Sequence, residues 1–397
     1  MIEKIKKNRL CLGCGLCSSV VGQEKCEMRL VKTGFYEPEA KKPFTSSEEK
    51  AVKQLCPAVH VEARSHVGVW GNMLSACEAW SADAFIRHKA ASGGVTTSLA
   101  IFALEHHLVD AVLQVGVRSD SYIYNELQVS RSREDILRNA QSRYAPALVF
   151  HQIKTILDSS SDLYAFIGKP CDIAAMQNLV RMCPQYKGRI KYFLSIFCAG
   201  MPSYNATLKA WQQSGHKDTP VALKYRGDGW PGKFTAQFDD GSTYQMTYNE
   251  SWGKILGRDV AFRCKICPDG IGLLADIAIG DSWNTKDGYP DFTESDGKCF
   301  CMVRTKDGAS LMDAAAKEEY IKSRPINLQE VKNQQPYQYK RRKLAGWRLL
   351  PVQVMTGWLL HFEGLNLLSL ALTANLRKGF RDMCGTYKRF RKELHGK

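Results

Sequence analysis

Cysteines carry the most chemistry in this sequence, and their spacing is that of metal ligands. Cys264 and Cys267 form a Cys-x-x-Cys pair, which brings two thiolates to one metal centre. Cys171 and Cys198 come earlier, each directly after a short apolar run. We predict that these four cysteines together hold one iron–sulfur cluster. The alternative for each single cysteine is an inert buried thiol, because cysteine is often buried.

A second group of cysteines occupies the first 60 residues. Cys11, Cys14 and Cys17 follow one another at three-residue steps, with small glycines between them. Cys56 lies further along and precedes a proline, which is typical of the fourth ligand in ferredoxin-type sites. Cys26 competes for that fourth place. Zinc is the alternative metal, because Cys-x-x-Cys also binds zinc, but a third cysteine at the same step favours iron.

The remaining composition limits the class of protein. With 14 cysteines among 397 residues, and no apolar secretory core in the segment 1–7, we expect a cytoplasmic protein whose clustered cysteines bind metal. A hydrophobic content of 44% and a charged content of 24% exclude wholesale disorder. The length suffices for two or three domains.

The elements that must position the single cysteines are buried strands. The run Tyr164–Gly168 leads into Cys171, and Tyr192–Phe197 leads into Cys198. Each reads as a strand followed by a turn and a helix, and Ala275–Asp281 reads as a third buried strand, which ends in a polar turn. The carboxyl ends of such strands meet at one edge of a sheet, where α/β proteins form their sites. The fold class that follows is α/β (α+β).

A phosphate site is one interpretation of Ser92-Gly93-Gly94, which precedes an expected helix from Val95 to Leu108. Free backbone N–H groups and the positive end of a helix dipole attract phosphate. The alternative is an ordinary helix cap, because serine is a common N-cap residue and glycine a common turn residue.

Three further positions have two interpretations each. Arg143 and Tyr144 suit a phosphate and an aromatic ring, or form an ordinary helix-entry turn. The glycine-rich loop Arg226–Gly232, which contains Trp230, lines a pocket or makes a tight β-connection. We assign no catalytic acid or base, because the carboxylates at candidate positions are equally suited to caps and turns; these are Asp172, Asp228 and Asp281.

The basic character of the chain belongs to its C-terminal end. The net charge is +15, and residues 340–397 carry 13 Lys and Arg against three acidic residues. Between Leu349 and Leu376, breaks at Pro351, Gly357 and Gly364 exclude a membrane-spanning helix. Two interpretations remain: peripheral contact with the inner face of an anionic membrane, and a helical hairpin packed on the body with a solvated basic end. We expect no nucleic-acid partner, because the basic cluster lacks a binding motif.

In order along the chain, blocks from about residue 10 to about residue 320 resemble those of the coenzyme F420 hydrogenase/dehydrogenase beta-subunit family. The blocks are Ala91–Gly94, Ser142–Tyr144, Gly168–Cys171, Phe197–Gly200, Tyr225–Gly232, Cys264–Asp269, Ala275–Asp276 and Gly280–Asp281. Members of this family are iron–sulfur flavoproteins that pass electrons between clusters, FAD and an organic acceptor. Bacterial members similar to this sequence often accompany polysaccharide-synthesis genes.

The resemblance implies a set of cofactor-binding residues. FAD is expected near Ser92, Gly93, Gly94, Ser142, Arg143, Tyr144 and Lys169. An inner 4Fe-4S cluster is expected on Cys171, Cys198, Cys264 and Cys267. The N-terminal cysteines supply one cluster, where some members carry a two-cluster ferredoxin module. The segment after about residue 326 lies outside the shared blocks.

We therefore expect an oxidoreductase of three parts. Residues 1–65 form a ferredoxin-like 4Fe-4S lobe, 66–325 a flavin- and iron–sulfur-binding domain, and 326–397 a basic helical extension. Electrons from reduced ferredoxin or a similar donor would pass through the two clusters to FAD and an organic acceptor. Two rival classes are an electron-transfer subunit whose partner performs catalysis, and a zinc-bound structural protein of a membrane-associated polysaccharide assembly.

Overall fold

A nine-stranded mixed sheet forms the centre of the molecule, in a computed structural model that describes residues 1–395. Its strand order is β17-β4-β16-β13-β9-β8-β5-β6-β7. The strands are β4 (Ser75–Ser81), β5 (Ala111–Val117), β6 (Asn125–Ser130), β7 (Ala147–Leu148), β8 (Tyr164–Gly168), β9 (Ile190–Ile196), β13 (Ile277–Asp281), β16 (Cys299–Val303) and β17 (Ile321–Pro325). The four central strands β13, β9, β8 and β5 run parallel, which confirms the expected mixed α/β class.

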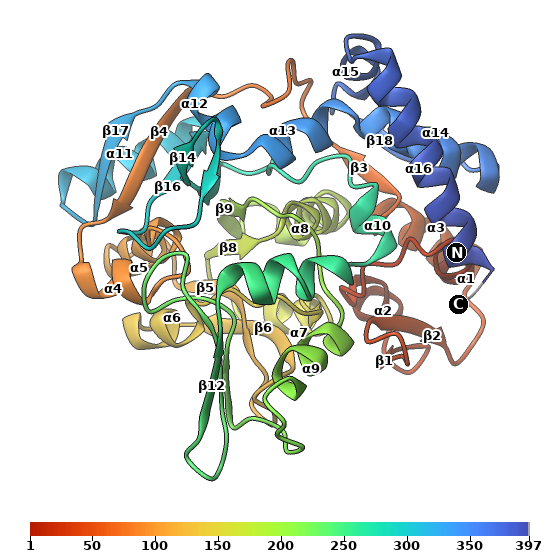
Figure 1. Ribbon diagram of the computed structural model, residues 1–397. Helices are drawn as coiled ribbons and strands as arrows, with labels where there is room; N and C mark the ends of the chain where they lie inside the picture. Colours follow the sequence, from red (N-terminus) through yellow and green to blue (C-terminus); the bar gives the residue numbers. More distant parts are fainter. Residues whose placement is uncertain (396–397) are drawn as a thin grey trace.

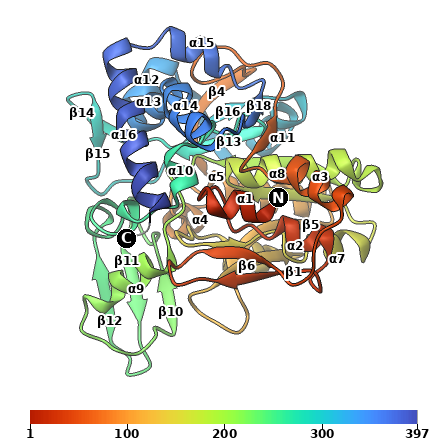
Figure 2. The ribbon, with the colours of Figure 1, turned by 90° about the vertical axis from the view of Figure 1, so that its right-hand side faces the viewer.

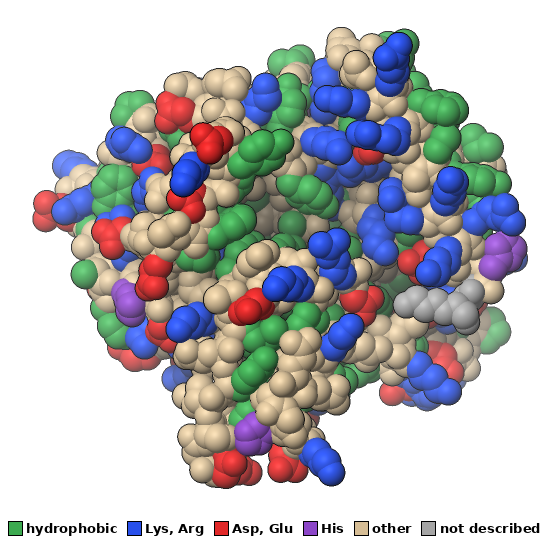
Figure 3. Space-filling model, in the orientation of Figure 1, with side chains coloured by type: hydrophobic (Ala, Val, Ile, Leu, Met, Phe, Trp, Pro, Cys, Tyr) green, Lys and Arg blue, Asp and Glu red, His purple; other side chains and the backbone are tan. Residues whose placement is uncertain are grey.

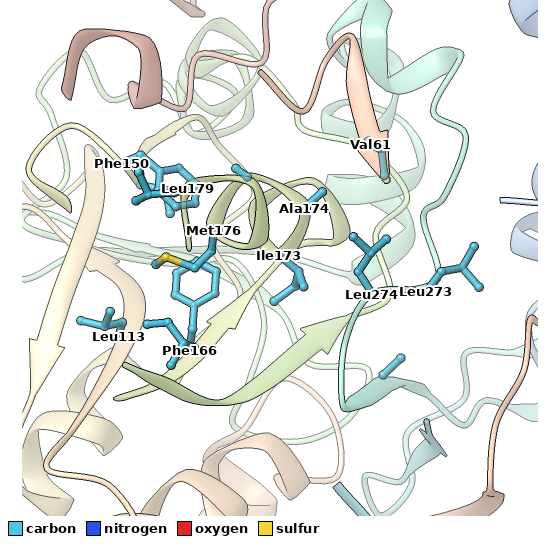
Figure 4. Close-up of a cluster of buried hydrophobic side chains, with 14 of the residues drawn as sticks. Val61, Leu113, Phe150, Phe166, Ile173, Ala174, Met176, Leu179, Leu273 and Leu274 are labelled. Atoms are coloured by element: carbon cyan, nitrogen blue, oxygen red, sulfur yellow. The ribbon is translucent and has the colours of Figure 1, made fainter. Parts of the chain in front are cut away.

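Helices cover both faces of this sheet. They are α4 (Ala84–Lys89), α5 (Val95–Glu105), α6 (Arg133–Asn139), α7 (Ile153–Asp158), α8 (Pro170–Met182) and α11 (Lys306–Lys317). Side chains alternate along a strand, so Val112 packs toward α5 and α11 while Leu113 packs toward α7 and α8. Figure 4 shows the second of these layers, in which Ile173 and Met176 of α8 lie over Phe166. Each parallel strand is therefore buried on both faces, as its continuous apolar sequence predicts.

Local sequence explains where the helices that border the site begin. Pro170 is the first residue of α8, and Asp172 accepts a hydrogen bond from the backbone N–H of Lys169 at 3.0 Å. Ser203 caps the helix that follows β9. Gly94 precedes α5 with a φ of +78°, a conformation that glycine adopts without strain. These starts set the first turns of α5 and α8 at the carboxyl edge of the sheet.

The N-terminal segment and the C-terminal segment meet on one side of the sheet (Figures 1 and 2). The first contains α1 (Ile2–Lys7), α2 (Leu16–Val21), β1 (Cys26–Leu30), β2 (Tyr36–Ala40), α3 (Ser46–Leu55) and β3 (His60–Glu62). The second contains α12 (Leu328–Gln334), α13 (Pro336–Lys343), α14 (Ala345–Thr356), β18 (His361–Glu363), α15 (Leu367–Leu372) and α16 (Leu376–Leu394). Strand β18 pairs with β3 in parallel, and Phe390 of α16 is buried against Phe262.

A smaller three-stranded sheet projects from the body, as Figure 1 shows at its lower edge. The remaining α-helices and strands are α9 (Tyr204–Gln212), β10 (Ala222–Lys224), β11 (Phe234–Gln237), β12 (Thr243–Met246), α10 (Phe262–Lys265), β14 (Asn284–Lys286) and β15 (Tyr289–Asp291). The turn at 239–242 joins β11 to β12, which confirms the predicted hairpin. Among the described residues no helix combines the length and apolarity that crossing a membrane requires.

Candidate functional site

The carboxyl ends of the parallel strands open into one cavity of about 310 Å³. Lys169 follows β8, Cys198 follows β9 and Asp281 ends β13, and all three line the cavity. Figure 3 shows the hollowed centre of this face of the molecule. Parallel strands bring residues that are distant in sequence to one edge of the sheet, which is where ligands bind in α/β folds.

The loop before α5 borders this cavity. Ser92 and Gly94 line it, together with the first residues of α5. The Ser92 hydroxyl donates to the carbonyl oxygen of Lys298 at 3.1 Å. Gly93 is not part of the lining, because it packs on the next strand: a Cβ there would lie 2.8 Å from the backbone nitrogen of Cys299. The loop thus places the N-terminus of α5 at the cavity and is held by the close packing of Gly93 on the strand that holds Cys299. A helix N-terminus suits an anionic group.

Residues 142–144 line the opposite wall, but Arg143 is already engaged by the protein. Its Nε donates to Asn125 at 2.6 Å and its Nη1 to the carbonyl of Leu223 at 2.9 Å. Burial lowers the pKa of Arg143 from its usual range. Arg143 therefore holds the wall of the cavity, and its Nη2 also donates within the protein, to the carbonyl of Tyr122 at 3.4 Å.

A buried arginine that we did not assign from the sequence lies at the centre of the site. Arg226 makes two hydrogen bonds to the carboxylate of Asp281, at 3.0 and 3.2 Å, and a third to the hydroxyl of Tyr144 at 3.2 Å. Its guanidinium lies over the rings of Tyr248 and Trp283. Burial alone would lower the pKa of Arg226, but Asp281 raises it well above its usual range. The charged pair gives the cavity a fixed polar wall.

Trp230 does not line the cavity. Its indole stacks on Trp283 with ring centroids 4.6 Å apart, and only 1% of Trp230 is exposed. Each interpretation of this loop therefore holds for one residue: Arg226 lines the cavity, while Trp230 packs in the core behind its wall. A charged residue within a run of glycines was the signal that could have singled out Arg226.

Three of the four inner cysteines line a small second pocket directly beside the cavity. These are Cys171, Cys198 and Cys264. Cys267 lies next to them, because its backbone N–H donates to the carbonyl oxygen of Cys264 at 3.3 Å. Burial raises the pKa of Cys198 to about 12. A cation is therefore needed if these thiols are to be held as thiolates.

A third pocket gathers the N-terminal cysteines. It is lined by Cys11, Cys14, Cys17 and Cys56. Cys26 is fully buried outside that lining. Burial raises the pKa of Cys14 to about 12. The geometry therefore supports Cys56 over Cys26 as the fourth member of this group.

The three pockets share residues and so form a continuous series. Cys14 lines both cysteine pockets, and Cys198 lines both the inner pocket and the cavity. Lys169 also borders the inner pocket and the cavity, and its Nζ lies 2.6 Å from the Asp172 carboxylate. Burial alone would lower the pKa of Lys169, but Asp172 and Cys171 raise it above its usual range. A permanent positive charge thus lies between the cysteines and the cavity.

The C-terminal segment contributes to the site, contrary to the sequence-based expectation of a polar, basic tail that begins where the body ends. Arg341 and Arg342 of α13 are buried, with 1% and 0% exposure. Arg341 donates to the carbonyl oxygens of Cys198, at 2.8 Å, and of Cys264. Burial alone would lower the pKa of Arg341, but Cys267 raises it above its usual range. A run of four basic residues looks solvent-facing in sequence, so its burial required the tertiary structure.

Helix α13 also reaches the cavity itself. Gln335 and Gln338 line it, and Gln335 donates to the carbonyl of Asp281 at 2.8 Å. The amide oxygen of Gln338 is buried and has no hydrogen-bond partner among the described residues. A buried polar atom without a partner is costly in a folded protein, and this one lies against Gly270, where a Cβ would come within 3.2 Å of it.

A polar groove of about 570 Å³ adjoins the cavity on the face of the small sheet. Gln141 and Tyr248 line both spaces. Its floor consists of hydroxyl and amide side chains from β11 and β12: Thr235, Gln237, Thr243 and Gln245. The cavity and the groove can thus hold one reactant each, with Gln141 and Tyr248 between the two reactants.

Two consecutive family matches cover most of the central chain. Residues 76–154 match the N-terminal part of the coenzyme F420 hydrogenase/dehydrogenase beta subunit, and residues 161–329 match its C-terminal part. Together they span well over half of the sequence. This chain belongs to that family. The resemblance is thereby confirmed, and the chain is an oxidoreductase component.

The relatives agree with this assignment. The beta subunit of F420-dependent formate dehydrogenase 1 from Methanococcus maripaludis is 28% identical over 249 residues, which are 62% of this chain and 60% of the relative. The beta subunit of coenzyme F420 hydrogenase from Methanosarcina barkeri is 24% identical, over 66% of this chain and 84% of the relative. An uncharacterized protein of Methanocaldococcus jannaschii is 23% identical over 80% of this chain and 90% of its own length.

The fold has a solved counterpart. A chain of the F420-reducing [NiFe] hydrogenase complex from Methanosarcina barkeri superposes with a TM-score of 0.55 and 20% sequence identity. The match covers 71% of this chain and 94% of the other. At this identity the likeness establishes the shared fold of the central part.

Proposed function

We propose that this protein carries electrons through two 4Fe-4S clusters to FAD, which then reduces an organic acceptor. The observation that carries the proposal is the series of three adjoining pockets, in which Cys14 and Cys198 are each shared by two neighbours. Electron transfer requires its centres to be close together, and shared lining residues provide that proximity. Cys11, Cys14, Cys17 and Cys56 hold the outer cluster, and Cys171, Cys198, Cys264 and Cys267 the inner one.

The residues around the cavity fit a flavin dinucleotide. Ser92, Gly94 and the start of α5 receive the pyrophosphate, because a helix N-terminus favours anions. The two rings of Tyr144 and Trp252, with centroids 4.8 Å apart, offer an apolar surface for a planar group. Lys169 places its charge between the flavin and the inner cysteines, where it stabilises an electron-rich ring. FAD supplies the change from one-electron to two-electron chemistry.

The groove on the small sheet is our candidate for the acceptor. Its hydroxyl and amide groups provide both donors and acceptors, which suit a polar organic molecule. Coenzyme F420 is the first acceptor to test, since relatives are named for it. Sugar-linked acceptors are the second, because the sequence resembles members that accompany polysaccharide synthesis. The chain would work in the cytoplasm, with reduced ferredoxin or another subunit as its electron donor.

The decisive experiment is chemical analysis of anaerobically purified protein. We expect about eight iron and eight sulfide per chain from two 4Fe-4S clusters, one FAD, and an absorbance spectrum with both iron–sulfur and flavin features. Cys198→Ser should lose about half of the iron, while Cys183→Ser, outside all three pockets, should retain it. A colourless protein that contains zinc would reject the proposal in favour of a structural role.

The same preparation separates catalysis from simple electron transfer. An enzyme with its own acceptor site should reduce F420 when supplied with reduced ferredoxin. A protein that carries both clusters and FAD, yet reduces acceptors only when another subunit is added, would be a non-catalytic electron-transfer subunit of a larger complex.

Peripheral membrane contact is a second proposal, on the C-terminal helices. Large apolar side chains of α14, the following loop, α15 and α16 are exposed by 45–81%: Leu350, Val354, Leu359, Leu368, Leu372, Leu376 and Phe380. Basic residues of α16, including Arg377, Lys378 and Arg381, are exposed beside them. Apolar and cationic side chains together bind anionic lipid interfaces. Figure 3 shows hydrophobic and basic groups together along the edge that carries these helices.

Vesicle sedimentation tests the membrane proposal. The protein should pellet with vesicles that contain phosphatidylglycerol and far less with pure phosphatidylcholine. The double substitution Leu368→Asp and Leu372→Asp should weaken pelleting at least tenfold. Tyr289→Asp, an exposed aromatic on β15, is the matched control and should bind as the native chain does. Equal binding to both lipids, or none, would leave only the helical hairpin packed on the body.

A further inference from the structure

A cluster of histidine and glutamate side chains lies where the C-terminal segment joins the N-terminal one, away from the three pockets. Strand β18 pairs with β3 so that His361 is opposite His60 and Glu363 is opposite Glu62. Residues opposite one another in neighbouring strands project on the same face of the sheet. All four side chains therefore share one face of this two-stranded unit.

Two imidazole rings of this cluster have their Nε2 atoms close to the same carboxylate oxygen. Nε2 of His60 lies 2.7 Å from Oε1 of Glu62, and Nε2 of His361 lies 3.5 Å from that atom. The two rings are stacked, with centroids 4.4 Å apart and planes inclined by 17°. The stacking directs both Nε2 atoms toward the same side. The three ligand atoms all lie within 4.8 Å of one another.

We propose that His60, Glu62 and His361 bind one divalent transition-metal ion, with zinc as the best match. Imidazole nitrogen and carboxylate oxygen are the ligands that zinc takes at about 2.0–2.2 Å. The ion would occupy the position to which both Nε2 atoms point, and Oε1 would be its third ligand. Glu363, whose Oε2 is 3.4 Å from Nε2 of His361, or water supplies the fourth.

The surroundings hold the ligands in place and allow the small adjustment that a metal requires. Arg181 donates to the other oxygen of Glu62, Oε2, at 2.5 Å, which leaves Oε1 free to face the two histidines. The side chain of His60 is 14% exposed and that of His361 is 46% exposed. His60 and Glu62 are thus the fixed half of the site, and His361 can turn toward the ion. The charge of Arg181 opposes a cation, and the two glutamates offset it.

The site would fasten the C-terminal segment to the N-terminal cysteine lobe. His60 follows Cys56 by only four residues, and β18 lies between α14 and α16. The three hydrogen-bonded positions of β3 and β18 make a short strand pair, which is weak by itself. A shared metal would secure this junction without contact to the cavity or the inner cysteines. The inference does not depend on the proposed redox function.

Zinc stoichiometry in the purified holoprotein tests the inference. Protein treated with a chelator is incubated with excess ZnCl2, desalted and analysed for zinc per chain. The native chain should retain one zinc more than His361→Ala and His60→Ala. Zinc on cysteines is common to all three proteins, so the difference isolates the histidine site. His106→Ala is the matched control, because His106 pairs with one carboxylate, Glu318, at 3.1 Å.

Thermal unfolding provides a second readout. Zinc should raise the melting temperature of the native chain and of His106→Ala by about 3 °C more than that of His361→Ala, because a ligand that binds only the folded state stabilises it. His361→Gln is the second variant, chosen because it keeps most of the side-chain volume at this half-exposed position. Equal zinc content and equal melting shifts in the native chain and the His361 variants would overturn the proposal.

Discussion

Arg341 places a positive charge beside the inner cysteines. Its position in a run of basic residues would suggest a solvent-exposed side chain. The guanidinium is buried and donates to the carbonyls of Cys198 and Cys264, so its positive charge lies beside the inner cysteine group. A thiolate-bound cluster carries net negative charge, which a nearby cation offsets. The charge near a cluster and the hydrogen bonds around it are established determinants of cluster potential. In this protein the C-terminal segment supplies that charge.

We therefore predict that Arg341→Gln lowers the midpoint potential of the inner cluster. A unit charge beside the cluster contributes on the order of 2 kcal/mol at an effective dielectric constant near 20, which is roughly 100 mV for one electron. Redox titration followed by electron paramagnetic resonance measures the shift. Arg341→Lys should retain most of the potential, and Lys340→Gln, exposed on the same helix, should retain all of it. An unchanged potential in Arg341→Gln would contradict the electrostatic role.

The prediction that Cys56 and not Cys26 is the fourth N-terminal ligand also concerns single side chains. Cys56 lines the N-terminal pocket, while Cys26 is completely buried beside Cys17. We expect Cys56→Ser to lose the outer cluster, so that iron per chain falls by about half. Cys26→Ser should keep the full iron content, and quantitative iron analysis of both proteins distinguishes them. Iron loss in Cys26→Ser alone would reverse the assignment.

At the scale of elements, one buried carboxylate joins three parts of the sheet. Glu78 of β4 binds Arg324 of the edge strand β17 at 2.6 Å and accepts from the hydroxyl of Ser282 at 2.5 Å. The amine of Lys298 lies 3.4 Å away. Burial alone would raise the pKa of Glu78, but these partners lower it below its usual range. Edge strand β17 is thus attached by charge as well as by its hydrogen bonds to β4.

The sign of the pKa shift predicts how this attachment depends on pH. Because the folded state lowers the pKa of Glu78, its stabilisation is present above about pH 4.3, the value of an unperturbed glutamate, and is lost as the pH falls further. Glu78→Gln should lower the free energy of unfolding by about 1–2 kcal/mol at pH 7. The difference from the native chain should shrink between pH 5 and pH 3.

Urea unfolding of both proteins across this pH range measures the difference, and effects of acid on the cofactors are common to both. Glu318→Gln, in a half-exposed pair with His106, should match the native chain at pH 7. A difference that stays constant down to pH 3 would show that Glu78 acts through packing and not through its charge.

For the molecule as a whole, the N-terminal and C-terminal segments both add residues to the site whose cavity the central sheet forms. The N-terminal segment supplies one cysteine pocket, the parallel sheet supplies the cavity, and α13 covers the region between them. The expected division into 1–65, 66–325 and 326–397 remains a prediction. Residues from these parts line pockets that share lining residues.

This arrangement predicts that loss of the inner cluster interrupts electron flow without removing either neighbour. Cys171→Ser should lose about half of the iron, retain FAD, and fail to reduce that FAD when reduced ferredoxin is added. Rapid-mixing absorbance at the flavin wavelengths measures the rate. Cys183→Ser should keep the native rate. Fast flavin reduction in Cys171→Ser would show that the outer cluster reaches the flavin directly.

Local sequence determined much of this protein. The spacing of Cys11, Cys14 and Cys17, the strands that precede Cys171 and Cys198, and the hairpin at 239–242 follow from ligand spacing and side-chain alternation, which act over a few residues. The residue types also indicated the family. The presence of iron, sulfide and FAD remains a prediction, which chemical analysis of anaerobically purified protein tests.

Only the tertiary structure decided which residues meet. Arg341 and Gln338 reach the site from a segment that reads as solvated tail, and Arg143 is engaged by the protein itself. His361 meets His60 across 300 residues. A charged side chain is buried when partners from distant segments satisfy its hydrogen bonds, and the pairing of distant segments is a property of the packed fold that no local pattern contains.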